Sequence, residues 1–281
     1  MSGSRQPEQS IRPQDLRAGD VLLSRGSARL GSRVSDWIAL LDGGDYSHAS
    51  FWDGARVIEA TGCEGKIRVD SLDHLQHEHE YVHVYRFSRH GATLGENAWP
   101  VEPVVAVAQS YIGGGYAYDE LYLFGVLVGL GRLVGFPQMQ GLMRSAGPKL
   151  RSALPRLRAS ELRPMTCSQL VAAVFFEADP TPTHRYTLEV PFRVGRLALD
   201  GSALEADPQF DMKEWQEYEQ LRDGYRALIG SGCEPQTHAA RAFGVEPEVV
   251  RIGDPRLPPC CVTPSDLERS PTLVNLGALA G

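Results

Sequence analysis

Short stretches of alternating or continuous apolar residues dominate the first third of the chain. The segment GDVLLS (19–24) predicts a buried strand that follows a Gly-Asp turn. Four further strands are predicted between turn residues: SHASFWD (47–53), ARVIEAT (55–61), KIRVDSL (66–72) and YVHVYRF (81–87). Because few residues separate these four strands, the pattern predicts an antiparallel meander.

Apolar residues at helical spacing predict helices on both sides of these strands. The first lies within 27–44, where apolar side chains share one face and a Gly-Gly pair ends the helix. Later helices are predicted at 101–113, 118–137, 163–178 and 212–230. The order of helix, sheet and then helices is typical of an α+β domain.

Changes in composition along the chain predict its organisation. Residues 1–14 are polar and are expected to be disordered, and 15–179 carry the main run of strands and helices. Residues 180–257 are punctuated by Pro and Asp, which suggests an insertion or subdomain of unknown role. Residues 258–281 return to a texture of strands and turns and are expected to rejoin the main domain.

Charge and cysteine usage narrow the function classes. The net charge of −7 argues against a protein that binds a nucleic-acid backbone, and no basic run interleaved with aromatic residues is present. Five scattered cysteines in 281 residues fit reduced thiols better than a disulfide framework. The first residues contain no apolar core of a signal peptide, so a cytoplasmic protein is expected, with export by a signal-independent route left open.

One cysteine stands where a nucleophile would be activated. In RPMTCSQLVAAVFFEA (163–178), Cys167 begins the predicted helix and Thr166 is placed to cap it. A helix N-terminus favours a thiolate and offers free N–H groups to an oxyanion. The alternative is that Cys167 is a small buried residue, as free cysteine often is.

A base for this thiol is suggested by the first predicted hairpin. If the chain turns at Asp53-Gly54, His48 and Glu59 lie directly opposite each other on one face of the hairpin. Glu59 has apolar neighbours in sequence and needs a partner, and a carboxylate can orient an imidazole whose other nitrogen faces a thiol. The alternative is a cross-strand pair with a structural role only.

Four histidines within eleven residues suggest a possible metal-binding site. DHLQHEHEYVH contains His74, His77, His79 and His83. The run mixes turn and strand character, offers no other evident class of ligand and adjoins acidic residues typical of a solvated loop. No metal site is therefore predicted, and no organic cofactor is expected.

The order of several motifs resembles a known family. LRAGDVLLSRG, YSHASFW, VIEATG, YDELYLFG, MTCSQLVAAVF and VTPSDLERSPTL together are similar to the YaeF/YiiX amidase-like branch of the permuted NlpC/P60 papain-like superfamily. The resemblance covers about 15–178 and 258–275. It implies a circularly permuted papain-like α+β fold, in which an antiparallel sheet packs against the helix that carries the nucleophile.

The resemblance also implies roles for individual residues. Cys167 would be the nucleophile, His48 the base and Glu59 the group that orients it. Residues implied near the substrate or the oxyanion are Tyr46, Tyr118, Thr166 and Ser168, and the alternative role of Tyr46 is packing within its strand. Gln169 departs from relatives, which often carry Glu there.

The substrate is less well determined by these motifs. The resemblance implies hydrolysis of an amide in a peptide, an isopeptide or a peptidoglycan fragment. The apolar stretch at 121–136 is expected to be a buried helix packed on the sheet. Its alternative role, an apolar groove or lid for an acyl chain or a membrane, keeps a lipid acyl hydrolase or acyltransferase of the lecithin:retinol acyltransferase-like kind open. A catalytically silent peptide-binding module is a third alternative, and a dedicated secretion or immunity partner also stays open.

Overall fold

The computed structural model describes residues 10–26, 44–61, 65–115, 165–192, 248–253 and 262–280. Its elements run in chain order as β1 (Ser10–Ile11), a 3-10 helix (Pro13–Asp15), β2 (Val21–Gly26), β3 (His48–Trp52), β4 (Val57–Thr61), β5 (Lys66–Asp70), α2 (Leu72–Glu78), β6 (His79–Arg89), β7 (Ala92–Thr93), α3 (Glu102–Ser110), α6 (Cys167–Glu177), β8 (Glu189–Phe192), β9 (Glu248–Arg251), α9 (Pro264–Glu268) and β10 (Leu273–Leu279). The molecule is therefore a mixed α+β protein.

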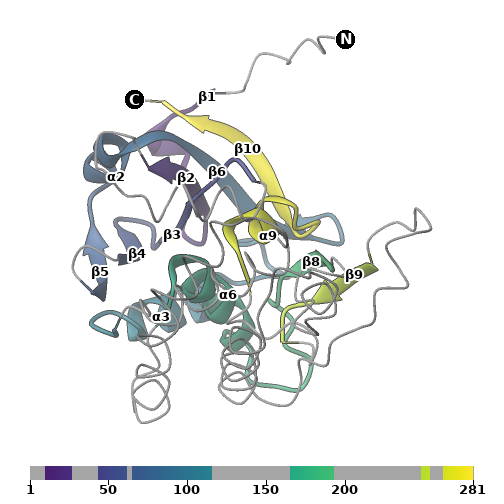
Figure 1. The fold of residues 1–281 in the computed structure, drawn as a ribbon. Helices are drawn as coiled ribbons and strands as arrows, with labels where there is room; N and C mark the ends of the chain where they lie inside the picture. The colour runs from purple at the N-terminus through teal and green to yellow at the C-terminus, as the bar shows by residue number, and fades with distance from the viewer. Residues whose placement is uncertain are drawn as a thin grey trace, which may run out of the picture.

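Within the described residues, one sheet dominates the fold (Figure 1). Its strands follow the order β1-β10-β6-β2-β3-β4-β5, and β7 pairs with β6. All neighbours in this sheet are antiparallel except β1 and β10, which are parallel. β8 and β9 form a separate antiparallel pair.

The predicted meander is correct for β3 to β5 and wrong for the following strand. β6 does not continue beyond β5 but pairs with β2, on the side of β2 opposite to β3. The short helix α2 makes this crossing possible, because it carries the chain from the edge strand β5 back over the sheet. This crossing brings the first residues of β6 close to the first residue of β3.

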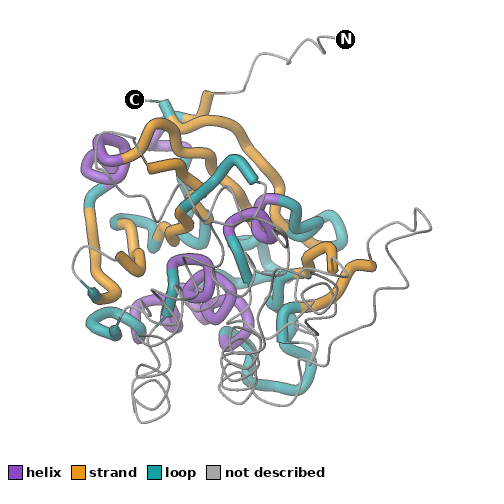
Figure 2. Tube along the Cα trace, in the orientation of Figure 1, coloured by secondary structure: helices purple, strands orange, loops and turns teal. Residues whose placement is uncertain are grey.

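Helices α3 and α6 cover one face of the sheet, and α2 lies over the other (Figure 2). The α6 side carries the larger core, in which the ring of Phe87 stacks on Phe175 at 5.7 Å and Phe51 meets the same ring edge-on at 6.3 Å. Each buried aromatic or aliphatic side chain of this size contributes roughly 1.5–3 kcal/mol. The packing of α6 on β3 thus holds the start of the helix against the start of the strand.

The N-terminal end of the chain differs from the sequence-based expectation, whereas the C-terminal end returns to the main sheet as expected. Residues 10–14, predicted to be disordered, contain β1 and begin the 3-10 helix, because Ser10 and Ile11 pair with Ala278 and Leu279 of β10. Residues 1–9 lie outside the described part. β10 itself lies between β1 and β6, so the C-terminal segment contributes the second strand from one edge of the sheet.

The segment 180–257 is not separate from the main core at its ends. Tyr186 and Leu188 before β8, and Val250 and Ile252 in and after β9, are buried in the same cluster as α6. The predicted helices at 27–44, 118–137 and 212–230 lie outside the described residues.

Candidate active site

The helix that carries the candidate nucleophile begins at Cys167, as the sequence predicts. The Thr166 hydroxyl accepts a hydrogen bond from the Gln169 backbone N–H, and the Gln169 side-chain oxygen accepts one from the Thr166 N–H at 2.6 Å. This reciprocal arrangement is a capping box. Gln169, the residue that departs from the resembled family, therefore performs the capping role that Glu could also perform, without placing a negative charge beside the thiol.

Cys167 is a free cysteine that is only 3% exposed. Burial raises the pKa of its thiol, but hydrogen bonds with His48 and with the backbone N–H groups of Ala49 and Ser168 outweigh burial and lower that pKa. The positive end of α6 acts in the same direction. The surroundings of Cys167 therefore favour the thiolate.

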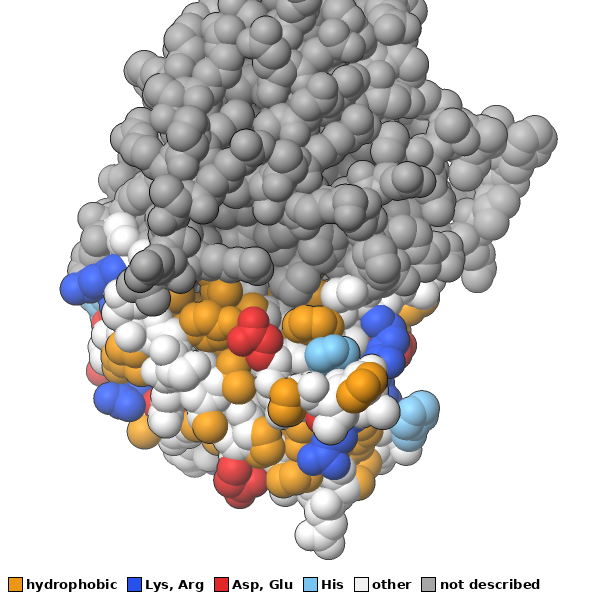
Figure 3. Space-filling view, turned by 90° about the horizontal axis from the view of Figure 1, so that it is seen from below, with side chains coloured by type: hydrophobic (Ala, Val, Ile, Leu, Met, Phe, Trp, Pro, Cys, Tyr) orange, Lys and Arg blue, Asp and Glu red, His pale blue; other side chains and the backbone are white. Residues whose placement is uncertain are grey.

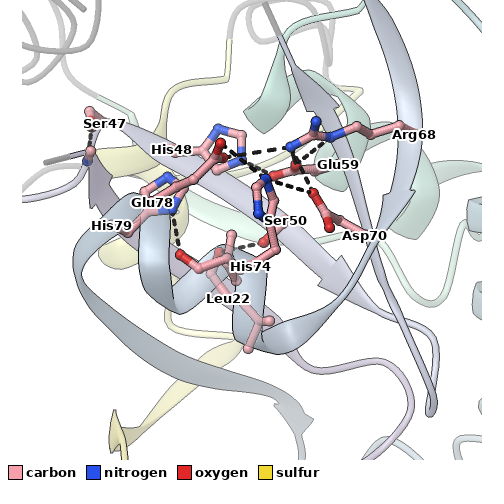
Figure 4. Close-up of polar contacts among 12 residues, drawn as sticks. Leu22, Ser47, His48, Ser50, Glu59, Arg68, Asp70, His74, Glu78 and His79 are labelled. Carbon is pink, nitrogen blue, oxygen red and sulfur yellow. Dashed lines mark hydrogen bonds and ion pairs between the residues drawn. The ribbon is translucent and has the colours of Figure 1, made fainter. Parts of the chain in front are cut away.

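His48 joins Cys167 to Glu59. Its Nε2 donates to Glu59 Oε2 at 2.8 Å, as Figure 4 shows, and Cys167 also acts on the ring, which leaves Nδ1 as the nitrogen available to the thiol. Burial opposes a charge on the imidazole, but the bonds to Cys167 and Glu59 outweigh it and raise the pKa of His48 to about 10. In this coupled pair the proton thus resides on the imidazole at neutral pH.

The pairing of β3 with β4 differs from the predicted register. Phe51 pairs with Ile58 and Trp52 with Val57. The turn therefore includes four residues, Asp53–Arg56, and not two.

The Asp53 side chain causes this longer turn. Its Oδ1 accepts hydrogen bonds from the backbone N–H groups of Ala55 and Arg56 at 2.9 and 2.7 Å. The Asp53 N–H also donates to the Arg56 carbonyl at 3.0 Å. An aspartate that binds its own following backbone in this way is a common means of closing a turn.

The candidate pair survives this change of register. Extending the observed register places Glu59 across from Ser50, so His48 and Glu59 are diagonal neighbours and are not directly opposite as predicted. A shift of two residues keeps every side chain on the same face of a strand. Diagonal neighbours are within reach of long side chains, which explains the observed 2.8 Å contact.

Arg68 on β5 holds the other oxygen of Glu59. Its Nε and Nη2 donate to Glu59 Oε1 at 2.9 and 2.8 Å, and Nη2 also lies 2.7 Å from Asp70 Oδ2 (Figure 4). Burial raises the pKa of Glu59, but His48 and then Arg68 outweigh burial and lower that pKa to about 2. Glu59 is therefore an ionised carboxylate that is held in place, with Oε2 bonded to His48 and Oε1 bonded to Arg68.

His79, the first residue of β6, covers His48. The two rings stack with centroids 5.2 Å apart and an interplanar angle of 19°. His79 Nδ1 donates to the Leu75 carbonyl at 2.9 Å, which fixes the ring on α2. Burial and the charge of His48 lower the pKa of His79 to about 4, so it is a neutral ring beside a charged one.

The Tyr46 hydroxyl is hydrogen-bonded to residues of β6. The side chain is buried, and the hydroxyl contacts His83 Nδ1 and the Tyr85 hydroxyl on β6. Burial and the bond to Tyr85 raise the pKa of Tyr46 well above its usual value. The hydroxyl implied to lie near the oxyanion thus has two protein partners, both on β6.

Of the other residues implied near the substrate, Ser168 and Thr166 have side chains that make structural hydrogen bonds. The Ser168 hydroxyl donates to the Val262 carbonyl at 2.7 Å, so it ties α6 to the C-terminal segment, while its backbone N–H faces Cys167. Thr166 is used as the helix cap. Tyr118 and the adjacent Asp119 lie outside the described residues.

The histidine run is mainly structural. Residues 72–78 form a helix where the sequence suggested turn and strand, and His74 on it lies 3.0 Å from Glu78. His79 and His83 lie on β6, where they contact His48 and Tyr46 respectively. Among the described residues, no group of His, Cys, Asp or Glu has the arrangement of a metal site.

A glycine allows the loop before β3 to reach this position. A Cβ at Gly44 would lie 1.7 Å from Ser265 Oγ on α9. The loop that leads to His48 therefore passes too close to α9 for any other side chain. This approach explains the need for glycine at the end of the segment where the sequence predicts a helix to stop.

Ser24 presents an unsatisfied hydroxyl next to the site. It pairs directly with His48 across β2 and β3 and is fully buried. Within the described residues its hydroxyl has no hydrogen-bond partner. Ser50, two residues further along β3, donates to the Leu22 carbonyl at 3.4 Å instead.

An open pocket of about 570 Å³ borders this network along the outer edge of β5. Arg68, Asp70 and His74 line it on the polar side, and Ile112 and Gly113 on the side of α3. Gly115 joins this region to the nucleophile, because its carbonyl accepts a hydrogen bond from Met165, two residues before Cys167.

Two members of the network, Arg68 and His79, were not predicted from the sequence. Arg68 pairs directly with Glu59 across β4 and β5, so extending the hairpin reasoning by one strand would have found it. His79 has no such local signal. Its position depends on the crossing of β6 over the sheet.

The exposed surface is mixed in character. On the described part of the face in Figure 3, hydrophobic side chains lie among both positive and negative ones. None of the helices in the described ranges has the length and apolarity needed to span a bilayer. Compared with models of protein families and with curated proteins, the chain matches none of either.

Proposed function

We propose that this protein is a cysteine hydrolase that cleaves an amide bond through a thioester on Cys167. The observation that carries the proposal is that His48 lies between Glu59, 2.8 Å from its Nε2, and Cys167 at the start of α6, each of which raises the pKa of the imidazole. A thiol, an imidazole and an orienting carboxylate in this order form the constellation of nucleophilic acyl transfer.

The proposed fold assignment is a circularly permuted papain-like fold. In support, the histidine and the acid lie on β3 and β4, which precede the cysteine helix in the chain, and that helix packs on the same sheet. This order agrees with the permuted NlpC/P60 branch that the motifs resemble.

The first half of the proposed reaction forms the thioester. The Cys167 thiolate attacks the amide carbonyl carbon, a C–S bond forms, and the oxygen becomes an oxyanion. As the sulfur loses its charge, the Ser168 N–H that bonds it in the resting state is released toward this oxyanion. His48 then transfers its proton to the leaving nitrogen as the C–N bond breaks.

The second half returns the enzyme to its starting state. Neutral His48 takes a proton from a water molecule, whose oxygen attacks the thioester carbon. The C–S bond breaks, the acid leaves, and the Cys167 thiolate and the His48 imidazolium are restored. Glu59 stays ionised throughout, because Arg68 holds its second oxygen.

The proposal is tested by an activity assay on wild type, Cys167→Ala and the matched control Cys63→Ala. Each protein is given peptidoglycan stem peptides, isopeptides and phospholipids in separate reactions. Amide hydrolysis that is lost only in Cys167→Ala is expected. The acyl group on Cys167 is identified by mass spectrometry after acid quenching. A fatty-acyl thioester formed from phospholipid would replace this proposal by a lipid acyl hydrolase or transferase, and no acylation by any substrate would favour a binding module.

A further inference from the structure

A second pocket, of about 330 Å³, lies at the opposite end of β6 from the candidate active site. Its lining includes Arg89, Arg185, Arg251, Glu189, Trp99 and Thr183. We call it the arginine pocket. His79 stacks on His48 at one end of β6 and Arg89 lines the pocket at the other, so at the usual rise per residue the two sites are roughly 30 Å apart. Figure 1 likewise shows β8 and β9 far from α2 and β5.

The three guanidinium groups are held in place by neighbouring oxygens. Arg89 donates to the carbonyls of Arg185 and Thr187 at 2.8 and 2.9 Å, and to Glu189 Oε1 at 2.7 Å. The Arg185 guanidinium lies over the ring of Tyr186, 4.7 Å from its centroid. These contacts fix the direction of the positive groups before any ligand arrives.

Arg251 retains donors for a ligand. Its Nη2 donates to the carbonyls of Thr183 and His184 at 2.8 Å each. Within the described residues, the hydrogen bonds of its guanidinium all come from this one nitrogen. A guanidinium carries five N–H groups, so the other edge of Arg251 can bind a carboxylate or phosphate in a bidentate manner.

The loop that forms one wall is also rigidly built. The Asp179 carboxylate accepts hydrogen bonds from the Thr181 N–H and hydroxyl at 3.1 and 2.7 Å, from the Thr183 hydroxyl at 2.9 Å and from the Arg185 N–H at 2.9 Å. This loop therefore holds Thr183 and Arg185 in a fixed geometry. A ligand that binds there does not have to order the loop, so that part of the free-energy cost of binding is reduced.

The charges of the pocket do not balance. Three arginines line it, whereas Glu189, 32% exposed, is the acidic residue of its lining. Burial lowers the pKa of Arg89, Glu189 raises it, and the charge of Arg251 lowers it further, so the net direction is downward. The excess stands out in a protein with a net charge of −7.

We propose that the arginine pocket binds an oxyanion, the phosphate or carboxylate group of a small ligand, with Arg185 and Arg251 as its contacts and the partly buried Arg89 as the cation behind them. The bound anion relieves the repulsion among the guanidinium groups. Trp99 offers an apolar wall to the rest of the ligand. This site is independent of the function proposed for Cys167.

The test titrates the full-length protein with inorganic phosphate and, separately, with citrate, at constant ionic strength maintained with chloride. Binding is followed by calorimetry and by the thermal unfolding midpoint. Saturable binding of at least one probe is expected, and the tighter one identifies the chemical source of the oxyanion. Arg251→Gln should weaken it at least tenfold, while the control Arg56→Gln, an arginine paired with Asp53 in the β3–β4 turn, should leave it unchanged.

Glu189→Gln provides a second variant with the opposite expected sign. It removes the competing carboxylate from Arg89, so binding should tighten severalfold, a result that a purely structural role for these arginines does not produce. Absence of saturable binding in wild type, or equal binding by Arg251→Gln and wild type, would overturn the proposal.

Discussion

Glu59 accepts a hydrogen bond from His48 through one carboxylate oxygen and a bidentate pair from Arg68 through the other. The carboxylate therefore cannot rotate away from the imidazole without breaking both contacts with arginine. Because both oxygens of Glu59 are hydrogen-bonded, its carboxylate fixes the orientation of the His48 ring, which a simple ion pair would not do.

We expect Glu59→Gln to lower the turnover of a peptide amide roughly 10²-fold or more, because the amide neither holds the imidazolium nor fixes its orientation. Glu78→Gln is the matched control, since Glu78 lies 3.6 Å from Arg68 at the outer end of the same network. Steady-state kinetics on both variants decide the matter. Equal effects of the two changes would argue against a specific role for Glu59.

Arg68→Gln should destabilise the fold by about 3 kcal/mol, since it leaves the buried Glu59 carboxylate with one of its two cationic partners, His48. Arg56→Gln, whose ion pair with Asp53 is 53% exposed on the arginine side, should change the free energy of unfolding by less than about 1 kcal/mol. Urea denaturation measures both. If Arg68→Gln proved as mild as Arg56→Gln, Glu59 would not depend on this arginine.

The lowered pKa of Cys167 predicts its reactivity toward iodoacetamide. A group with a lowered pKa is ionised above that value, so alkylation should reach its plateau below the ordinary thiol pKa of about 8.5. His48→Ala removes the partner and should move the midpoint upward, whereas the control Cys63→Ala should not. Labelling of Cys63 or Cys233 as fast as Cys167 at neutral pH would count against the site.

Turnover should decline as the pH rises through about 10, where His48 loses the proton needed by the leaving group.

The stacked histidines should titrate far apart. His79, with its pKa lowered to about 4, is expected to stay neutral from pH 5 upward, while His48, raised to about 10, stays charged up to pH 9. Imidazole chemical shifts followed by NMR across this range, assigned with His79→Phe, test both statements. A midpoint near 6.5 for either ring would contradict the stacked arrangement.

Two buried serines on adjacent strands should respond oppositely to removal of their hydroxyls. Ser24→Ala removes a buried hydroxyl that has no partner among the described residues, so it should stabilise the protein by about 1 kcal/mol. Ser50→Ala removes a donor to the Leu22 carbonyl and should destabilise it by a similar amount. Loss of turnover in a stabilised Ser24→Ala protein would show that the hydroxyl next to His48 is used in the reaction.

Several features of the site follow from local sequence alone. The alternation of strands β3 and β4 determines that His48 and Glu59 share a face, and this survives the four-residue turn because a slip of two residues preserves side-chain parity. The capping box of Thr166 and Gln169 likewise needs only residues that are three apart, so the start of α6 at Cys167 is readable from the sequence.

Tertiary structure decided the rest. The crossing of β6 to the far side of β2 brings His79 onto His48 and gives Tyr46 its partners, His83 and Tyr85. Likewise, β10 at the end of the chain completes the pairing of Ser10 and Ile11 near its start. Such contacts join segments whose separation in sequence carries no periodic signal, since the pairing of distant strands depends on the packing of the whole sheet and not on the propensity of either strand.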